Sequence, residues 1–179
     1  MTHTKAIAFI ILLTIAASSS IAQNHVLRDH DISLQITNAE ELYQIVKIVD
    51  GDTFFAKSEQ GITLKYRLIG INTPEFSHFG RPEQPFAQEA TDFLAALLKD
   101  RYVILKYDVQ RQDKYGRELV YAYLPDGTFI NSKLMTAGWA QIMTIPPNVA
   151  HTSCFLAQQH QAQSQNLGIW ARSLSLKDR

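Results

Sequence analysis

The chain has 179 residues, 46% of them hydrophobic and 19% charged, which is enough apolar surface to bury a core and excludes a disordered chain. Its 17 basic and 17 acidic residues balance, which excludes tight, non-specific attachment to a polyanion through overall charge, so any recognition of phosphate must be local. Cys154 is the only cysteine and cannot form a disulfide within the chain; we interpret it as a small apolar side chain on a helix.

Residues 1–22 show the order of segments that is typical of a secretory signal peptide. His3 and Lys5 precede an apolar run over residues 6–17, and Ser20-Ile21-Ala22 is a small-x-small cleavage site. The alternative is an uncleaved membrane anchor, but spanning a bilayer takes about 20 apolar residues and this run is shorter. We therefore expect cleavage, export to the periplasm or the medium, and no stable membrane insertion afterwards. Because Lys5 leaves with the signal, the mature chain has 16 basic and 17 acidic residues.

The rest of the chain divides into an N-terminal extension at 23–40, one domain at 41–172 and a tail at 173–179. Within the domain, alternating apolar residues and turn pairs such as Asp50-Gly51 predict a series of strands. Thr73-Pro74 ends the clearest of them, because proline cannot continue a strand ladder. The predicted strands cover residues 41–50, 53–56, 62–71, 102–109 and 119–124, and a turn at 125–127 leads into an extended stretch at 128–130.

Three helices are predicted between and after these strands. Residues 83–99 carry apolar side chains at spacings of three and four, the pattern of an amphipathic helix. A short helix over 131–137 has Asn131 as its N-cap and Gly138 at its end, and Asn148 caps a last helix that runs to about Gly168. This order predicts a β-rich α+β domain, in which the strands close into a small barrel capped by helices.

Four charged side chains lie at or near the ends of predicted strands, where a barrel can present them: Asp52, Arg67, Glu75 and Arg117. Carboxylates can bind a hard cation or act on a water molecule, and guanidinium groups can bind charge that develops on phosphoryl oxygens. The set is suited to splitting a phosphodiester, although a residue of this kind taken alone is more often a surface charge or part of a salt bridge. Arg67 is the most informative, because an arginine in an apolar strand is costly unless a partner neutralises it.

Three segments resemble the signature motifs of the thermonuclease family, typified by staphylococcal nuclease. They are Val49–Thr53 (VDGDT), Arg67–Glu75 (RLIGINTPE) and Asp113–Arg117 (DKYGR), in the family's order and at similar spacing. The similarity continues through Gly138, Pro147-Asn148 and Leu167–Trp170, so that it covers residues 44–171. The resemblance implies a five-stranded OB-fold barrel capped by about three helices.

The resemblance also implies a Ca²⁺ site. Asp52 and the backbone carbonyl of Thr73 would bind the ion, and Glu75 would act on the attacking water as general base or as its orienter. The family's second calcium-binding aspartate corresponds to Asn72 here. An amide oxygen can coordinate Ca²⁺ but adds no negative charge, so we predict weaker Ca²⁺ binding than at a site with two aspartates.

The substrate contacts implied by the resemblance come from four further positions. Arg67 and Arg117 would bind the scissile phosphate and stabilise the transition state, while Lys114 and Tyr115 would contact a neighbouring phosphate. The expected reaction is hydrolysis of DNA and RNA to 3′-phosphate ends, with Ca²⁺ as cofactor, nucleic acid as partner and a monomer as the active species.

Met143 and Ile145 depart from the type protein, which has tyrosines in contact with the bound nucleotide at these positions. Neither side chain here can donate a hydrogen bond or offer an aromatic face. The resemblance therefore predicts the hydrolytic centre but not the base preference or the affinity for substrate.

A second hypothesis is that the chain is a non-catalytic OB module that binds nucleic acid or protein, and Asn72 favours it. Retention of Arg67, Glu75 and Arg117 together counts against it, because a pure binding module has no need of this set. A binding module would also need a basic groove and aromatic platforms, which a neutral chain does not suggest. Nothing in the sequence favours a third reading, an exported structural protein. We therefore predict an enzyme.

The remaining candidate residues are predicted to be structural. His78, His151 and His160 show no recognisable zinc-binding spacing with carboxylates, and we expect structural or surface roles for them. Trp139 and Trp170 are predicted to be core aromatics rather than stacking platforms.

Overall fold

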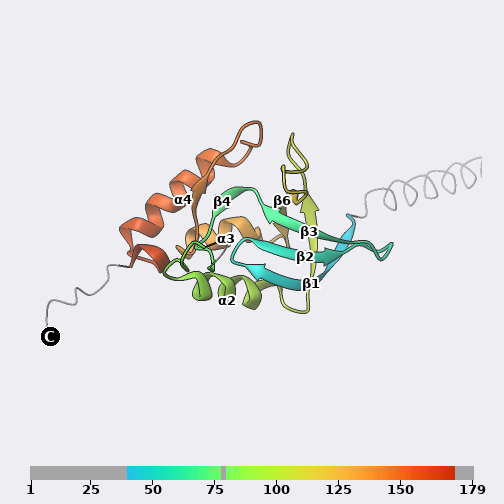
Figure 1. Ribbon diagram of the computed structural model, residues 1–179. Helices are drawn as coiled ribbons and strands as arrows, with labels where there is room; N and C mark the ends of the chain where they lie inside the picture. Colours follow the sequence, from blue (N-terminus) through green and yellow to red (C-terminus); the bar gives the residue numbers. More distant parts are fainter. Residues whose placement is uncertain (1–39, 78–79, 172–179) are drawn as a thin grey trace, which may run out of the picture. The chain divides into compact units, whose positions relative to one another are not determined.

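The computed structural model describes residues 40–77 and 80–171 (Figure 1). All of the described helices and strands belong to the unit that begins at Glu41. The signal peptide at 1–22, the extension as far as residue 39, His78 and the tail at 173–179 lie outside the described residues and stay predictions. In the described part of the chain, no helix is both long enough and apolar enough to cross a membrane.

Five strands close into a barrel. They are β1 (Leu42–Asp50), β2 (Thr53–Lys57), β3 (Thr63–Leu68), β5 (Tyr102–Lys106) and β6 (Glu118–Tyr123). Around the barrel they follow the order β1-β2-β3-β6-β5. β3 and β6 run parallel, while the other neighbouring strands are antiparallel. The predicted α+β class and the five-stranded OB-type barrel are confirmed.

Helices and a second, small sheet surround the barrel. The helices are α2 (Ala87–Leu98), α3 (Ile130–Thr136), α4 (Thr152–Ser164) and the 3-10 turn η1 (Gly168–Trp170). The small sheet pairs β4 (Gly70–Asn72) with β7 (Gln141–Met143). α2 packs against β1, whereas α3 packs against β6 and α4 (Figure 1).

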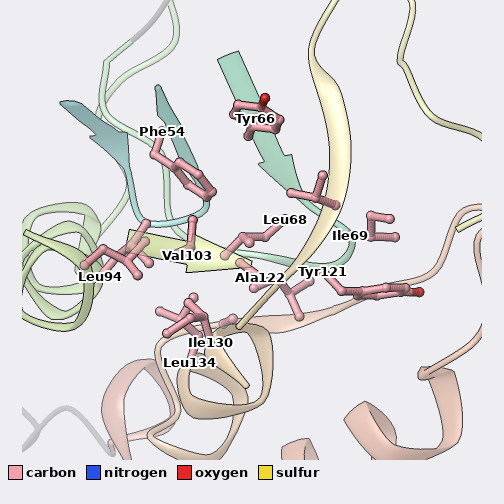
Figure 2. Packing of buried hydrophobic residues seen from close by; sticks show 14 of the residues in the cluster. Phe54, Tyr66, Leu68, Ile69, Leu94, Val103, Tyr121, Ala122, Ile130 and Leu134 are labelled. Atoms are coloured by element: carbon pink, nitrogen blue, oxygen red, sulfur yellow. The ribbon is translucent and has the colours of Figure 1, made fainter. Parts of the chain in front are cut away.

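The core fills the barrel and the space between it and the helices. Inward-facing Phe54 and Ala56 of β2 are fully buried, as strand alternation requires. Figure 2 shows Phe54 and Val103 close to Leu94 of α2, with Leu134 of α3 on the other side of the cluster. Fully burying one leucine stabilises a fold by about 1.5–3 kcal/mol, so α2 is held by its apolar face rather than by helix propensity.

The strand predicted over 62–71 is in fact two strands, and that prediction was wrong. β3 ends at Leu68, and the chain leaves the barrel to form β4 with β7 as its partner. Gly70 adopts φ 79°, a left-handed conformation that interrupts the ladder. A Cβ at this position would lie 2.6 Å from Cε2 of Phe155, so the ring of this α4 residue occupies the space where a side chain of residue 70 would be. β7 itself was not predicted, because three residues are too short for an alternating pattern.

Two predicted helix caps were also wrong. Asn131 lies inside α3, where its buried side chain donates to the Ile69 carbonyl (3.0 Å) and accepts from the Ala122 amide (3.1 Å). Asn148 precedes α4 by a turn, and His151 occupies the cap position. Gly138, in contrast, follows α3 with φ 76° and ends it as predicted.

Three other predicted boundaries shift. The helix predicted from residue 83 begins only at Ala87, because Phe86 takes φ 71°. The strand predicted over 102–109 ends at Lys106. The extended stretch predicted at 128–130 reduces to an isolated bridge between Phe129 and Tyr123, since α3 begins at Ile130.

Candidate active site

Asp52 is buried in the tight connection between β1 and β2 and is 4% exposed. Its Oδ2 accepts hydrogen bonds from the backbone amide of Thr73 (3.0 Å) and from the Thr73 hydroxyl (3.1 Å), and its Oδ1 accepts from the Thr53 hydroxyl (3.0 Å). Gly51 permits this approach, because a Cβ there would lie 2.7 Å from Oγ1 of Thr73. The β1–β2 turn and the segment after β4 are thus joined at the carboxylate.

Arg67 has the partner that its position in an apolar strand requires. Its Nη2 lies 2.9 Å from Oδ2 of Asp52 and donates to Oδ1 of Asn72 at 3.1 Å, while Nη1 donates to the Leu68 carbonyl. Only 8% of the residue is exposed. Breaking such a buried pair by removing one partner leaves an uncompensated charge and is strongly destabilising.

Asp50 places a second carboxylate beside this pair, and the sequence analysis did not assign it to the site. Burial and the neighbouring charge of Asp52 raise the pKa of Asp50 to about 6. Asp50 also accepts a hydrogen bond from the Asp52 amide (3.1 Å). VDGDT places two carboxylates two residues apart across a turn, and this pattern could have predicted that Asp50 lies at the site beside Asp52.

The donor atoms around Asp52 fit a hard cation. Asp50 and Asp52 offer carboxylate oxygens, Asn72 an amide oxygen and Thr73 a backbone carbonyl, which are the ligand types that Ca²⁺ takes. Among the described residues, no three His, Cys, Asp or Glu side chains gather in a way that could hold a metal. A cation here would therefore depend on the amide and carbonyl oxygens as well as the carboxylates. Asn72 Nδ2 currently donates to the Thr73 carbonyl at 3.3 Å.

Arg117 comes from the loop between β5 and β6 and is oriented by Asp113. The Asp113 carboxylate accepts from Nε of Arg117 (2.7 Å), from its backbone amide (3.0 Å) and from the Tyr115 amide (2.9 Å). Burial alone would raise the pKa of Asp113, but these hydrogen bonds and the Arg117 charge outweigh it and lower the pKa. Because Nε is engaged, the outer edge of the guanidinium is left to bind an anion.

Arg67 and Arg117 line the same recess, which has a volume of about 140 Å³. Its wall is largely apolar, and the two departures noted in the sequence, Met143 and Ile145, form part of it. The full lining is Arg67, Leu68, Ile69, Gly70, Ile71, Gln110, Asp113, Arg117, Leu119, Met143, Ile145 and Asn148.

The other predicted site residues lie at the edge of this arrangement. Glu75 is exposed, does not line the recess, and is tied through its backbone to Gln84 (3.1 and 2.9 Å). Tyr115 is 73% exposed, with Nζ of Lys114 lying 5.0 Å from its ring centroid. Lys114 and Tyr115 thus sit beside Arg117 at the rim.

Asn148, which the sequence analysis assigned as a helix cap, instead holds the site together. Its Oδ1 accepts from the Gln110 amide (2.7 Å), and its Nδ2 donates to the Gln110 carbonyl (2.8 Å). Asp108 adds a bond from the Ala150 amide at 3.2 Å. These contacts fasten the loop of Arg117 to the segment of Ile145, and so fix both walls of the recess. No local pattern could have predicted a pairing across 38 residues.

The fold and site together define a class of protein. A small barrel that holds two arginines beside a carboxylate-rich oxygen cluster is a centre for binding a phosphoryl group and a hard cation. Residues 65–172 match the family model described as staphylococcal nuclease homologue, and the chain belongs to this family.

Several proteins similar to this chain are named as nucleases. A thermonuclease of Staphylococcus hyicus is 36% identical over 140 residues, which cover 78% of this chain and 82% of the relative. A thermonuclease of Staphylococcus intermedius is 37% identical over 132 residues, covering 74% and 77%. The SPbeta prophage-derived endonuclease YokF of Bacillus subtilis is 31% identical over 136 residues, covering 74% of this chain and 45% of that protein.

Proposed function

We propose that this protein is an exported, Ca²⁺-dependent nuclease that hydrolyses phosphodiester bonds of DNA and RNA and leaves 3′-phosphate ends. The observation that carries the proposal is that Arg67 of β3 and Arg117 of the β5–β6 loop line one recess while Arg67 pairs with Asp52. The names of the similar proteins, two thermonucleases and an endonuclease, support it.

The arginines act on the reacting phosphate. Both guanidinium groups are held by protein carboxylates, so they need little reorganisation when charge accumulates on the phosphoryl oxygens. They bind that charge more tightly in the transition state than in the ground state, and this difference accelerates the chemical step. Lys114 and Tyr115, at the rim, contact a neighbouring phosphate.

Glu75 acts on the attacking water and accepts its proton. The water oxygen forms a bond to phosphorus as the bond from phosphorus to the 5′ oxygen breaks; the 5′ oxygen takes up a proton from solvent and leaves as a hydroxyl, and the phosphate stays on the 3′ side. Asp52, the Thr73 carbonyl and Asn72 would hold Ca²⁺, with Asp50 adding charge nearby. When bound, the ion neutralises charge on a phosphate oxygen. Since Asn72 adds no negative charge, we expect weaker Ca²⁺ binding than at a site with two aspartates.

The test is digestion of single-stranded DNA by the purified protein with calcium or with chelator. We expect calcium-dependent cleavage that Glu75→Ala loses. Arg67→Ala and Arg117→Ala should each lower kcat by at least about 10²-fold, the effect of removing one oxyanion donor. Arg101→Ala, at an exposed arginine away from the recess, is the matched control and should retain activity.

Two outcomes would contradict this assignment. Near-normal turnover of both arginine variants would mean that the recess is not the catalytic centre. Binding of DNA by folded protein without cleavage at any calcium concentration would favour the non-catalytic module. Asn72 would then be the first residue to replace, by aspartate, in a test for recovered cleavage.

A further inference from the structure

A row of basic and aromatic side chains crosses the outside of the barrel. Lys47 of β1 is paired with Phe55 of β2, and Phe55 with Lys65 of β3. Directly paired residues of neighbouring strands point to the same face of a sheet. The residues that flank Phe55 along β2, Phe54 and Ala56, are fully buried in the barrel, so the row points outward.

A second row lies beside the first. Tyr102 of β5 is paired with Gln44, Gln44 with Lys57, and Lys57 with Thr63. Lys57 follows Phe55 by two residues on β2 and therefore shares its face. Tyr102 is 49% exposed. We define the outer face as these two rows together: Gln44, Lys47, Phe55, Lys57, Thr63, Lys65 and Tyr102.

The outer face is locally basic in a chain of zero net charge. Its charged members are lysines, and none of them forms an ion pair with a carboxylate in the described ranges 40–77 and 80–171. At its edge, Glu59 shares a shallow hollow with Lys57 and Tyr102. Nζ of Lys65 lies 5.9 Å from the ring centroid of Phe55. Lysines around aromatic rings are the combination that binds single-stranded nucleic acid without sequence preference.

The outer face is continuous with the arginines of the candidate active site. Arg67 follows Lys65 by two residues on β3, so both side chains leave the strand on the same side. β3 and β6 are parallel, with Arg67 beside Leu119, and Arg117 directly precedes β6 and lines the same recess as Arg67. Figure 1 shows β1, β2 and β3 side by side. Two strand spacings separate the backbones of Lys47 and Lys65 by about 10 Å, a span that a few nucleotides cover.

We propose that the outer face binds the part of a single-stranded nucleic acid that extends beyond the scissile phosphate, with the lysines on its backbone and with Phe55 and Tyr102 against its bases. This inference rests on the proposed function, because it assigns the face to that enzyme's substrate. It also explains how a neutral chain can hold a polyanion, since the basic residues are gathered on one face.

The test compares Lys47→Ala/Lys65→Ala with a matched control, Lys99→Ala/Lys133→Ala, whose lysines are exposed at the end of α2 and on α3. The probe is a fluorescent thymidine oligonucleotide of about 16 residues, the upper site size of one OB fold, and binding is followed by anisotropy in chelator over a range of salt concentrations. For a single strand each lost phosphate contact lowers the salt slope by about 0.7, so we expect a fall of about 1.4 for the first pair. The control pair should leave the slope unchanged. Phe55→Ala should weaken binding about tenfold.

Cleavage kinetics separate this inference from the proposed function. With calcium, Lys47→Ala/Lys65→Ala should raise KM for the long oligonucleotide at unchanged kcat, and leave cleavage of an oligonucleotide of about 4 residues as it was. An unchanged salt slope for Lys47→Ala/Lys65→Ala, or an equal fall in the control pair, would show that the outer face does not bind the strand, even if the protein cleaves DNA. If the parent protein cleaves neither oligonucleotide, the proposed function fails, and the salt slopes still decide whether the face binds. Thermal melting of each variant confirms that it is folded.

Discussion

Asp113 illustrates how a single carboxylate can prepare an arginine for catalysis. It engages Nε and the backbone amide of Arg117, and a third bond comes from the Tyr115 amide. The guanidinium thus loses rotational freedom, while its outer edge stays available for phosphate. Positioning of this kind is worth more in a transition state than a flexible charge of the same sign, because no reorganisation is needed when charge develops.

Replacing Asp113 by asparagine should change both stability and its pH dependence. The pKa of this carboxyl is lowered from 3.8 on folding, so its ionised form stabilises the fold above about pH 4, and this stabilisation is lost as pH falls through the folded-state pKa. We expect Asp113→Asn to unfold at lower urea concentration than wild type at pH 7, and the gap to close as the pH falls below 3.8 and through the folded-state pKa. Parallel curves for the two proteins across this range would contradict the assignment. In activity assays, kcat should fall because Arg117 loses its orientation.

At the scale of secondary-structure elements, the site depends on a strand that stops early. β3 keeps Arg67 in the barrel, while β4 leaves the barrel, brings Asn72 to Arg67 and leads Thr73 to the Asp52 carboxylate. The change of direction needs Gly70 in a left-handed conformation, with the Phe155 ring packed where a side chain would begin. One glycine thus couples the position of α4 to that of the candidate cation site.

Gly70→Ala should therefore lower the free energy of unfolding by more than the backbone cost of placing an alanine in the left-handed conformation. Gly61 is the matched control: it has φ 84°, and no atom lies within 4 Å of the position that an added methyl group would take, so Gly61→Ala reports the backbone cost, about 1–2 kcal/mol. At Gly70 the methyl group would also meet Phe155 at 2.6 Å, and displacing a buried ring adds to that cost. Chemical denaturation of both variants measures the difference. Equal losses would show that Phe155 moves aside freely.

For the molecule as a whole, the sequence was informative wherever a signal is local. Alternation and turn pairs predicted the barrel strands, and short motifs identified Asp52, Arg67 and Arg117. In the structure the two arginines line one recess, and Asp52 pairs with Arg67. These features depend on residues within a few positions of one another. They are therefore legible without knowledge of the tertiary fold.

What could not be predicted depends on contacts between distant segments. The position of Asn148 in the sequence suggests a helix cap, but its side chain forms hydrogen bonds with the backbone of Gln110 on another loop. The break at Gly70 depends on Phe155, far along the chain. The outer face needs the strand register, because Lys47 and Lys65 become neighbours of Phe55 only when β1, β2 and β3 pair. A neutral composition concealed this local accumulation of positive charge.

Calcium should stabilise the whole fold through the carboxylates at the β1–β2 turn. Asp50 and Asp52 repel each other when both are ionised, and a bound cation would relieve this repulsion. At about 100 times its Kd a ligand stabilises the native state by about 2.7 kcal/mol, which for a chain of this size is a rise in Tm of about 5–10 °C. We expect this rise for wild type in calorimetry with calcium against chelator.

Two variants decide which residues carry that response. Asp52→Asn should show no rise in Tm with calcium, because it removes the charge at the centre of the donor set. Its Tm with calcium is compared with its own Tm in chelator, since losing the pairing with Arg67 lowers both. Asn72→Asp should show a larger rise in Tm than wild type at the same calcium concentration, since ligand charge sets affinity. A calcium titration with the same or weaker apparent affinity for Asn72→Asp would show that position 72 does not limit binding. An undiminished rise in Asp52→Asn would place the ion elsewhere on the protein.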